Sequence, residues 1–243
     1  MKRFVAAVGG LVMLLTLSLV PVGPVEAAPP PDFDQAEFDR PLDIDNSYMP
    51  LEPGTTFIYE GKADGETFYE TFVVTDETKT ILGIKARVVR DTVWENGELV
   101  ELTEDWFAQD DAGNVWYLGE FSTDYQNGKV VGHEGSWQAG VKGAEPGIVM
   151  LANPKVGDSY AQEVAPGVAE DKATVLKLNE TLRVPHGRFT NVLVIKEFTP
   201  LEPGVVEHKY YAPGVGQIKT QMVKGGNEVS RLKDVKKEGK KED

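Results

Sequence analysis

Hydrophobic and polar positions alternate along most of this chain, which is the pattern of half-buried β-strands. Successive side chains of a strand point to opposite sides of the sheet, so residues two apart share a face. Three such rows are Phe57 with Tyr59, Phe68 with Phe72 and Val74, and Val100 with Leu102 and Trp106. These stretches are dense in β-branched and aromatic residues, which favours strands over helices. Each row therefore predicts a strand with one face toward a core and the other toward water.

Turn signals separate the predicted strands at short intervals. Turns that combine glycine with aspartate or asparagine fall at residues 63–65, 95–97, 111–114 and 126–128. Residues 191–195, Asn-Val-Leu-Val-Ile, are apolar on both faces and predict a strand in the middle of a sheet. Together these signals predict a single, mainly β domain that is built as an antiparallel meander.

The first residues have the form of an export signal. Lys2 and Arg3 precede an apolar run over residues 4–20, and Val25-Glu26-Ala27 fits a signal-peptide cleavage site. We expect residues 1–27 to be removed as a signal peptide, which places the mature protein outside the cytoplasm, either secreted or periplasmic. The alternative is an uncleaved anchor, because the apolar run is near the lower length limit for a membrane span. After cleavage no integral membrane span is expected.

Composition divides the rest of the chain into three parts. Residues 28–45 are rich in proline and aspartate and predict an extended leader. Residues 46–228 carry the strand and turn signals and predict the β domain. Residues 229–243 are mostly charged and have little to bury, which predicts a flexible charged tail.

Charge and cysteine content narrow the classes of partner. The chain has 39 acidic and 25 basic residues and a net charge of −14. Nucleic acid is disfavoured as a partner because phosphate binding needs a basic face, and anionic membrane surfaces are disfavoured for the same reason. The absence of cysteine excludes disulfides and the acylated cysteine of a bacterial lipoprotein. Composition does not determine the oligomeric state.

Motifs for catalysis or metal binding are absent from the sequence. It contains no Gly-x-Ser-x-Gly, no thiol and no phosphate-binding glycine loop, so no catalytic residue is predicted. The three histidines lack any zinc-ligand spacing, and Asp110, Asp111 and Asn114 lack the calcium-loop pattern and are typical of a turn. We therefore predict no metal and no cofactor, and we expect a protein that is not an enzyme.

Aromatic residues are the remaining functional signal. The candidate ligand-binding residues are Trp94, Trp106, Trp116, Trp137, His208, Tyr210, Ile148 and Met150. If the tryptophans line a concave sheet face, they hold an apolar molecule; if they face a second layer, they are core. Ile148 and Met150 belong to an apolar island in the glycine-punctuated segment 132–157, which is either a lid or a crossover that buries the island as a short strand. His208 is either part of the site or a half-buried histidine with one hydrogen bond.

Four stretches carry a resemblance to known proteins. They are residues 46–61, which contain Pro-Leu-Glu-Pro-Gly-Thr, residues 105–110, residues 113–120, and residues 207–216, which contain Lys-Tyr-Tyr-Ala-Pro-Gly-Val-Gly. They resemble a family of uncharacterised secreted bacterial β-rich proteins over most of the mature chain, with departures at Ser47 and Phe57, where proline and tryptophan are expected. The closing hairpin also resembles curved-sheet carrier proteins of the bacterial envelope. The resemblance implies export and a strongly curved antiparallel sheet or open barrel of about nine to eleven strands; it implies no activity.

Two functions of different classes follow. The first is a non-enzymatic, extracytoplasmic binding or carrier protein for an apolar or amphipathic small molecule or an envelope component. The second is a carboxylate-based hydrolase that acts on cell-wall or glycan material. A deep cavity with paired carboxylates and little apolar lining favours the hydrolase, and an apolar groove without such a pair favours the binding protein.

Overall fold

Each turn returns the chain beside the strand it has just left, so the sheet grows hairpin by hairpin. The computed structural model describes residues 29–238, and the predicted signal peptide lies outside them. A short 3₁₀ helix, η1 (Phe33–Gln35), precedes the first strand. The strands are β1 (Thr55–Ala63), β2 (Glu66–Ile81), β3 (Ile84–Glu95), β4 (Glu98–Gln109), β5 (Val115–Gln126), β6 (Lys129–Gly132), β7 (Trp137–Gln138), β8 (Gly147–Met150), β9 (Ser159–Ala161), β10 (Lys172–Val184), β11 (Gly187–Phe198), β12 (Val206–Ala212), β13 (Gly216–Lys224) and β14 (Val229–Lys237).

These strands form one antiparallel sheet, as the sequence predicted. Their order is β6-β5-β4-β3-β2-β1-β14-β13-β12-β11-β10-β9, and β7 and β8 pair with β5. The described part of the chain thus contains 14 strands, more than the expected nine to eleven. The excess includes the two- to four-residue strands β7, β8 and β9, which are too short to give a periodic signal.

The predicted flexible tail is wrong for residues 229–237, because they form β14. This strand pairs with β1 and β13 and so joins the two halves of the sheet. Its inward face needs few apolar residues: Leu232 is fully buried and Ser230 nearly so, while Arg231 and Lys233 alternate with them on the outer side. A charged composition is therefore compatible with a strand when only one face is covered.

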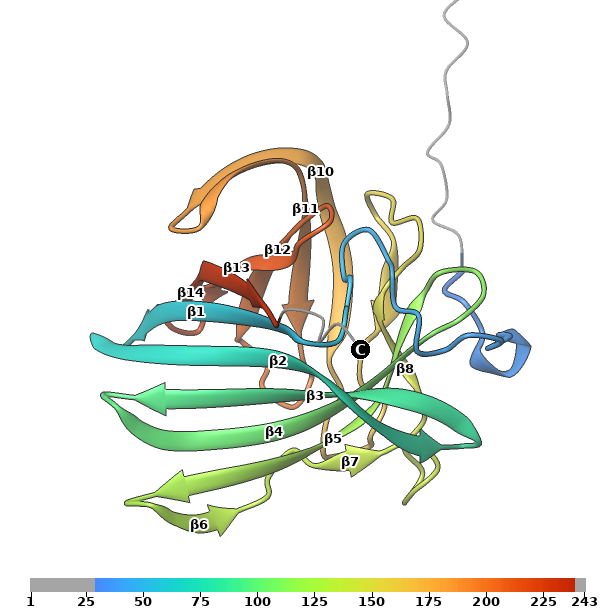
Figure 1. Cartoon of the computed structure of the whole chain (residues 1–243), viewed down its shortest axis with the longest axis horizontal. Helices are drawn as coiled ribbons and strands as arrows, with labels where there is room; N and C mark the ends of the chain where they lie inside the picture. The colour runs from blue at the N-terminus through green and yellow to red at the C-terminus, as the bar shows by residue number, and fades with distance from the viewer. Residues whose placement is uncertain (1–28, 239–243) are drawn as a thin grey trace, which may run out of the picture.

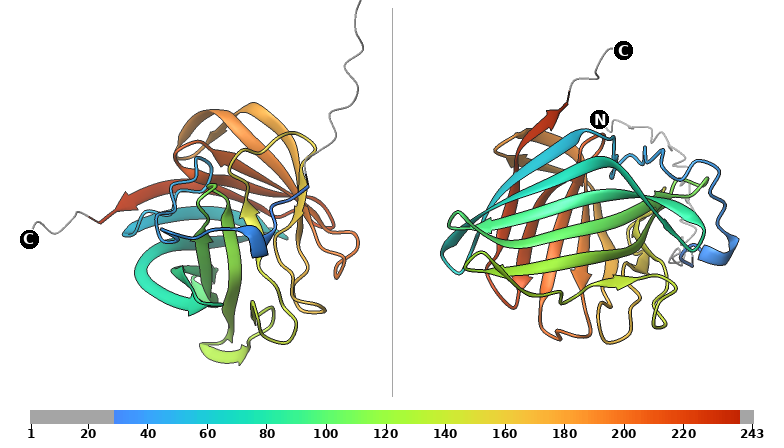
Figure 2. Two further views of the ribbon diagram at one scale, coloured as in Figure 1. Left: turned by 90° about the vertical axis from the view of Figure 1, so that its right-hand side faces the viewer. Right: turned by 60° about the horizontal axis from the view of Figure 1, so that its bottom comes forward.

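The sheet curls round its concave face without closing into a barrel (Figures 1 and 2). Its ends approach each other beside β8 and β9, where Glu145 N–H donates to the Val164 carbonyl at 2.8 Å in an isolated bridge. The backbone of Gly147 lies directly against that of Gln162. A Cβ atom at position 147 would lie 1.9 Å from the Gln162 carbonyl oxygen. Only glycine permits this close approach of the two segments.

Residues 29–51 pack along one end of the sheet. The rings of Phe33 and Phe38 lie 5.2 and 6.5 Å from that of Trp116 in β5. The Asn46 side chain donates to the carbonyls of Gly113 at 2.8 Å and Leu151 at 3.1 Å. Among residues 29–238, no helix has the length and apolar character needed to cross a bilayer.

The glycine-punctuated segment 132–157 is a crossover that belongs to the sheet. It contributes β7 and β8, which both pair with β5. Ile148 and Met150 are buried in the core. The interpretation of this segment as a crossover with a buried island therefore describes it better than the lid does.

Candidate functional site

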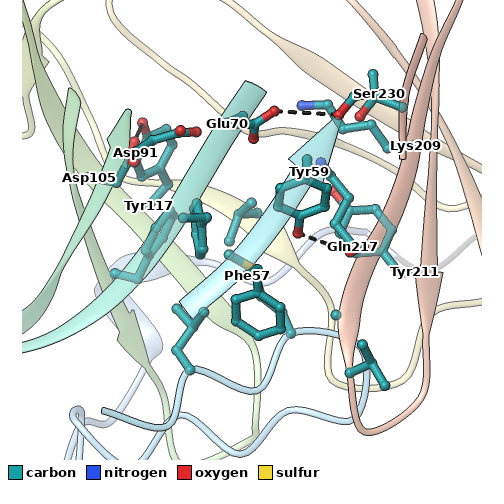
Figure 3. Close-up of a pocket in the computed structure, with 18 of the residues that line it drawn as sticks. Phe57, Tyr59, Glu70, Asp91, Asp105, Tyr117, Lys209, Tyr211, Gln217 and Ser230 are labelled. Atoms are coloured by element: carbon teal, nitrogen blue, oxygen red, sulfur yellow. Dashed lines mark hydrogen bonds between the residues drawn. The ribbon is translucent and has the colours of Figure 1, made fainter. Parts of the chain in front are cut away.

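A cavity of about 370 Å³ lies on the concave side of the sheet. Its lining comes from strands β1 to β5, from β8, from β12 to β14 and from short connecting segments. Tyr59 of β1 reaches across it, and its hydroxyl donates to the Gln217 carbonyl in β13 at 3.0 Å. Figure 3 shows Glu70, Ser230 and Lys209 gathered on one side of Tyr59 and Phe57 on the other. The cavity therefore has two ends of different chemistry.

One end is apolar. It is lined by Met49, Leu51, Phe57, Val149 and Val215, together with Phe72. The rings of Phe57 and Phe72, which sit opposite each other on β1 and β2, meet edge to face at 6.2 Å. Leu51 N–H donates to the Ile44 carbonyl at 2.9 Å, so the packed N-terminal segment holds this end of the cavity in place.

The other end is acidic. Seven carboxyl side chains line the cavity, and we call them the acidic cluster: Glu70, Asp91, Asp105, Glu120, Glu163, Glu207 and Glu228. The register of the sheet brings three of them together. Glu70 of β2 lies opposite Tyr59 of β1, Asp91 of β3 lies opposite Phe72 of β2, and Asp105 of β4 lies opposite Val89 of β3. Carboxyl groups from β2, β3, β4, β5 and β12 thus converge from across the sheet on one space.

Lys209 supplies the single basic side chain in the cavity lining. Its Nζ lies 2.6 Å from Glu197 Oε2, and Glu197 Oε1 accepts a hydrogen bond from Gln162 Nε2 at 2.9 Å. Burial opposes the charge on Lys209, but Glu197, Tyr211 and Glu207 outweigh it and raise the pKa of Lys209 well above its usual value. The lysine is therefore charged and already paired with a carboxylate outside the acidic cluster.

A tyrosine hydroxyl joins two members of the acidic cluster. Tyr117 Oη lies 2.5 Å from Asp105 Oδ1 and 2.8 Å from Glu120 Oε2. Tyr117 and Glu120 are three residues apart on one strand, so they share a face only because β5 shifts register against β4 at this point. Gly119 occupies the irregular position with φ of 130°, and a Cβ there lies 2.4 Å from the Trp137 carbonyl oxygen. The bulge requires this glycine.

Burial is the main cause of raised pKa values in the acidic cluster. It raises the pKa of Glu70, Asp105 and Glu120 to about 7 and that of Glu163 to about 9. It also raises the pKa of Asp91 well above its usual value, and the charges of Glu70 and Asp105 add to the effect. The Tyr117 hydroxyl, which can donate its one proton to either carboxylate, opposes the rise in the pKa of Asp105 and Glu120. Near pH 7 the cluster therefore carries less than its full negative charge.

The four predicted tryptophans lie outside the cavity lining. Trp106, Trp116 and Trp137 are buried, which matches their alternative interpretation as core. Lys79 Nζ lies 3.1 Å from the centre of the Trp106 ring, and Trp137 packs edge-on against Tyr117 at 5.4 Å. Trp94 is half-buried beside Tyr69, with ring centres 5.6 Å apart. These four residues do not come together as one binding surface.

The other four predicted residues also lie outside the lining. Ile148 and Met150 are core residues of β8, and His208 and Tyr210 lie on the face of β12 opposite to Lys209. Burial lowers the pKa of His208, and the surrounding lysines, Lys177, Lys196 and Lys219, lower it further. The imidazole is therefore neutral and half-buried, which agrees with the burial that the plainer interpretation of His208 expected.

The cavity is lined instead by the immediate sequence neighbours of these candidates. Asp105 and Phe107 flank Trp106, Tyr117 follows Trp116, and Val149 lies between Ile148 and Met150. Alternation separated the two faces at these positions but could not show which face the sheet would curl around. One signal was present: Glu70 stands in the middle of the apolar row Phe68, Phe72 and Val74.

Metal-binding geometry is absent from the described part of the chain. Residues 29–238 contain no group of three or more His, Cys, Asp or Glu side chains placed to hold an ion. The acidic turn near residue 110 has another role. The Asp110 carboxylate accepts hydrogen bonds from the Asn114 backbone and side chain and from Trp116 Nε1, all at 2.8 to 2.9 Å. These bonds fix the turn between β4 and β5.

Comparison with known proteins gives a limited result. No protein family matches the sequence, and no curated protein matches it. Among solved structures, the chain is similar to one described as a "putative lipoprotein" from Parabacteroides distasonis, with a TM-score of 0.43 and 13% sequence identity. The similarity covers 79% of this chain and 99% of that one. The resemblance to a family of secreted β-rich proteins therefore stays a prediction.

Proposed function

We propose that this protein is an exported, non-enzymatic binding or carrier protein that holds one amphipathic small molecule inside its curved sheet. The observation that carries the proposal is the cavity with an apolar end and an acidic end. Its volume of about 370 Å³ falls within the range of small-molecule sites. The apparent signal peptide in residues 1–27 supports export.

The affinity follows from the apolar area that the cavity covers. Burying ~200 Å² of ligand apolar surface contributes ~5 kcal/mol at ~25 cal/mol per Å². Loss of translational and rotational freedom opposes this gain, so the apolar end alone supports weak binding. Specific and tighter binding therefore depends on the polar end.

A hydrolase is the second candidate, because Asp105 and Glu120 form a carboxyl pair joined by Tyr117. Glycosidases that use two carboxyl groups keep one protonated as the acid and the other ionised, through environments that push their pKa values apart. Here burial raises both pKa values to about 7. This shared direction disfavours the hydrolase. If the protein hydrolysed peptidoglycan or another glycan, and Glu120→Gln abolished that activity, the hydrolase would become the preferred function.

Native mass spectrometry of the protein purified from its own host tests the binding function. We expect an added mass of a small molecule that denaturation releases. Val215→Trp places a large ring at the apolar end of the cavity and should abolish the added mass. The matched control is Val168→Trp, at an exposed turn away from the cavity lining, which should retain it. An added mass that persists in Val215→Trp, or a host protein that binds no small molecule, would contradict the proposal.

A further inference from the structure

The acidic cluster places more carboxyl groups in the cavity than the surrounding side chains can pair with positive charge. Within residues 29–238, none of its seven carboxyl groups lies within 4.0 Å of a lysine, arginine or histidine nitrogen. The nearby cation, Lys209, is engaged by Glu197 at 2.6 Å. Isolated carboxylates are costly to bury without a partner, and the lining sets seven carboxyl groups against the single positive charge of Lys209.

Asp91 shows this deficit at a single atom. Its Oδ1 is buried and has no hydrogen-bond partner among the described residues. Asp91 lines the cavity between Glu70 of β2 and Asp105 of β4, and the charges of both act on it. An acceptor that is buried and unpaired, in a wall of further acceptors, fits a ligand that brings donors and positive charge.

Aromatic rings form much of the remaining wall. Phe57, Tyr59, Phe72, Phe107, Tyr117 and Tyr211 all line the cavity. Phe107 and Tyr117 stack at 4.8 Å between ring centres directly beside the Asp105 carboxyl group. Aromatic faces attract ammonium groups, and a mixed wall of rings and carboxylates is the usual surrounding of a bound quaternary or primary amine.

The spread of the carboxyl groups separates an organic cation from a metal ion. A metal needs several donors at one point, and the described residues contain no three such side chains close enough together to hold an ion. The acidic cluster instead extends over five strands and two connecting segments. The cavity continues from it to the apolar end at Met49 and Val215. A molecule that fills this space therefore needs a charged part and an apolar body.

We propose that the ligand is an organic cation, an amine or quaternary ammonium compound with an apolar body, held with its charge among Glu70, Asp91, Asp105 and Glu120 and its body against Phe57. This inference rests on the proposed binding function. Glu70 and Asp91 set the preference for cations, and the apolar end accepts the hydrocarbon part.

Three probes with the same hydrocarbon chain and different head groups test the ligand class. Isothermal titration of the protein at about pH 8 with decyltrimethylammonium, decanol and decanoate compares a cation, a neutral molecule and an anion. We expect the cation to bind at least about tenfold more tightly than decanol, which corresponds to about 1.4 kcal/mol, and decanoate to bind most weakly.

Charge-removing variants locate the preference. Glu70→Gln and Asp91→Asn, singly and together, should reduce the affinity for decyltrimethylammonium by about tenfold or more while leaving the affinity for decanol within about twofold. Glu98→Gln, at the exposed start of β4, is the matched control and should change neither affinity. Circular dichroism confirms folding, and Glu70→Gln and Asp91→Asn should melt no lower than the unmodified protein, because each removes an unpaired buried charge.

The outcomes separate the ligand class from the function. Preferential binding of the cation that the two variants abolish supports both. Equal or tighter binding of decanol or decanoate overturns the cation class and leaves the binding function standing. Failure of all three probes, with no small molecule retained from the host, overturns both. A cation preference that persists in the double variant overturns the placement of the charge among these carboxyl groups.

Discussion

Raising the pH should destabilise the empty protein, because its buried carboxyl groups hold protons that the unfolded chain releases. Glu163 has a pKa of about 9 in the folded state. Burial raises it most, the negative charges of Asp171, Glu120 and Asp105 raise it further, and the positive charge of Lys209 lowers it. The pKa of Glu120 is about 7, raised by burial and by Asp105. Since the folded state binds more protons than the unfolded state above about pH 4.5, stability falls as pH rises through these folded-state pKa values.

The magnitude follows from proton linkage for one group at a time. Consider a carboxyl group with a pKa of about 4.5 in the unfolded chain. If its folded-state pKa is about 7, the protein loses about 2 kcal/mol of stability between about pH 5.5 and about pH 8.5, and if it is about 9, the loss is about 4 kcal/mol. The groups are coupled, so their effects do not simply add. Taking Glu163 alone, and about 2 to 4 °C per kcal/mol for a chain of this length, Tm should fall by about 8 °C or more.

Thermal and chemical denaturation at constant ionic strength measure this change. Glu163→Gln removes the contribution of about 4 kcal/mol worked out above, so the free energy of unfolding should fall by about that much less over the interval. The exposed Glu98→Gln is the control and should keep the original slope. Comparison of variants cancels the titration of the histidines, which is common to all. A Tm that is constant or rises with pH in the unmodified protein, or an unchanged slope in Glu163→Gln, would refute the reasoning.

Two further predictions concern the fold. Gly119→Ala should destabilise the protein by at least about 2 kcal/mol, because φ is 130° and the new Cβ meets the Trp137 carbonyl oxygen at 2.4 Å. Gly128→Ala, in an open turn, should cost less. Equal urea midpoints for the two variants would argue against the role of Gly119 in the bulge. Leu232→Ala should cost about 2 to 5 kcal/mol, because the side chain is fully buried in β14, whereas the exposed Lys233→Ala should change the unfolding midpoint little.

Local patterns predicted the parts of this fold that local physics determines. The turns at 63–65, 95–97 and 126–128 each join a pair of neighbouring strands, because glycine, asparagine and aspartate adopt the positive φ that tight hairpins need. The turn between β2 and β3 escaped notice because leucine occupies its first position, where Leu82 has φ of 50°. Ile81 pairs with Ile84 across the turn, so both of its residues take positive φ, and Gly83 with φ of 85° is the single local sign of it.

The candidate site depended on a choice that local patterns do not make. Alternation assigned His208 and Tyr210 to one face of their strand and Glu207 and Lys209 to the other, and the structure keeps that division. Hydrophobicity then suggested that the aromatic and histidine face would turn inward. The sheet curls the other way at this strand, so that Glu207 and Lys209 line the cavity. In β5 the buried Trp116 also lies outside the cavity lining, and Phe33 and Phe38 pack against it.

Structural need does not explain why the inward face is acidic. A sheet of this size gains stability from apolar contacts on its concave side, and replacing an unpaired buried carboxyl group by an apolar or amide side chain is generally neutral or stabilising. The cavity nevertheless keeps Glu70, Asp91, Asp105 and Glu120, all with raised pKa values, next to aromatic rings that already form a core. Groups that weaken the empty protein but strengthen a complex are characteristic of binding sites. The same four residues should therefore lower stability alone and raise it once a cation is bound.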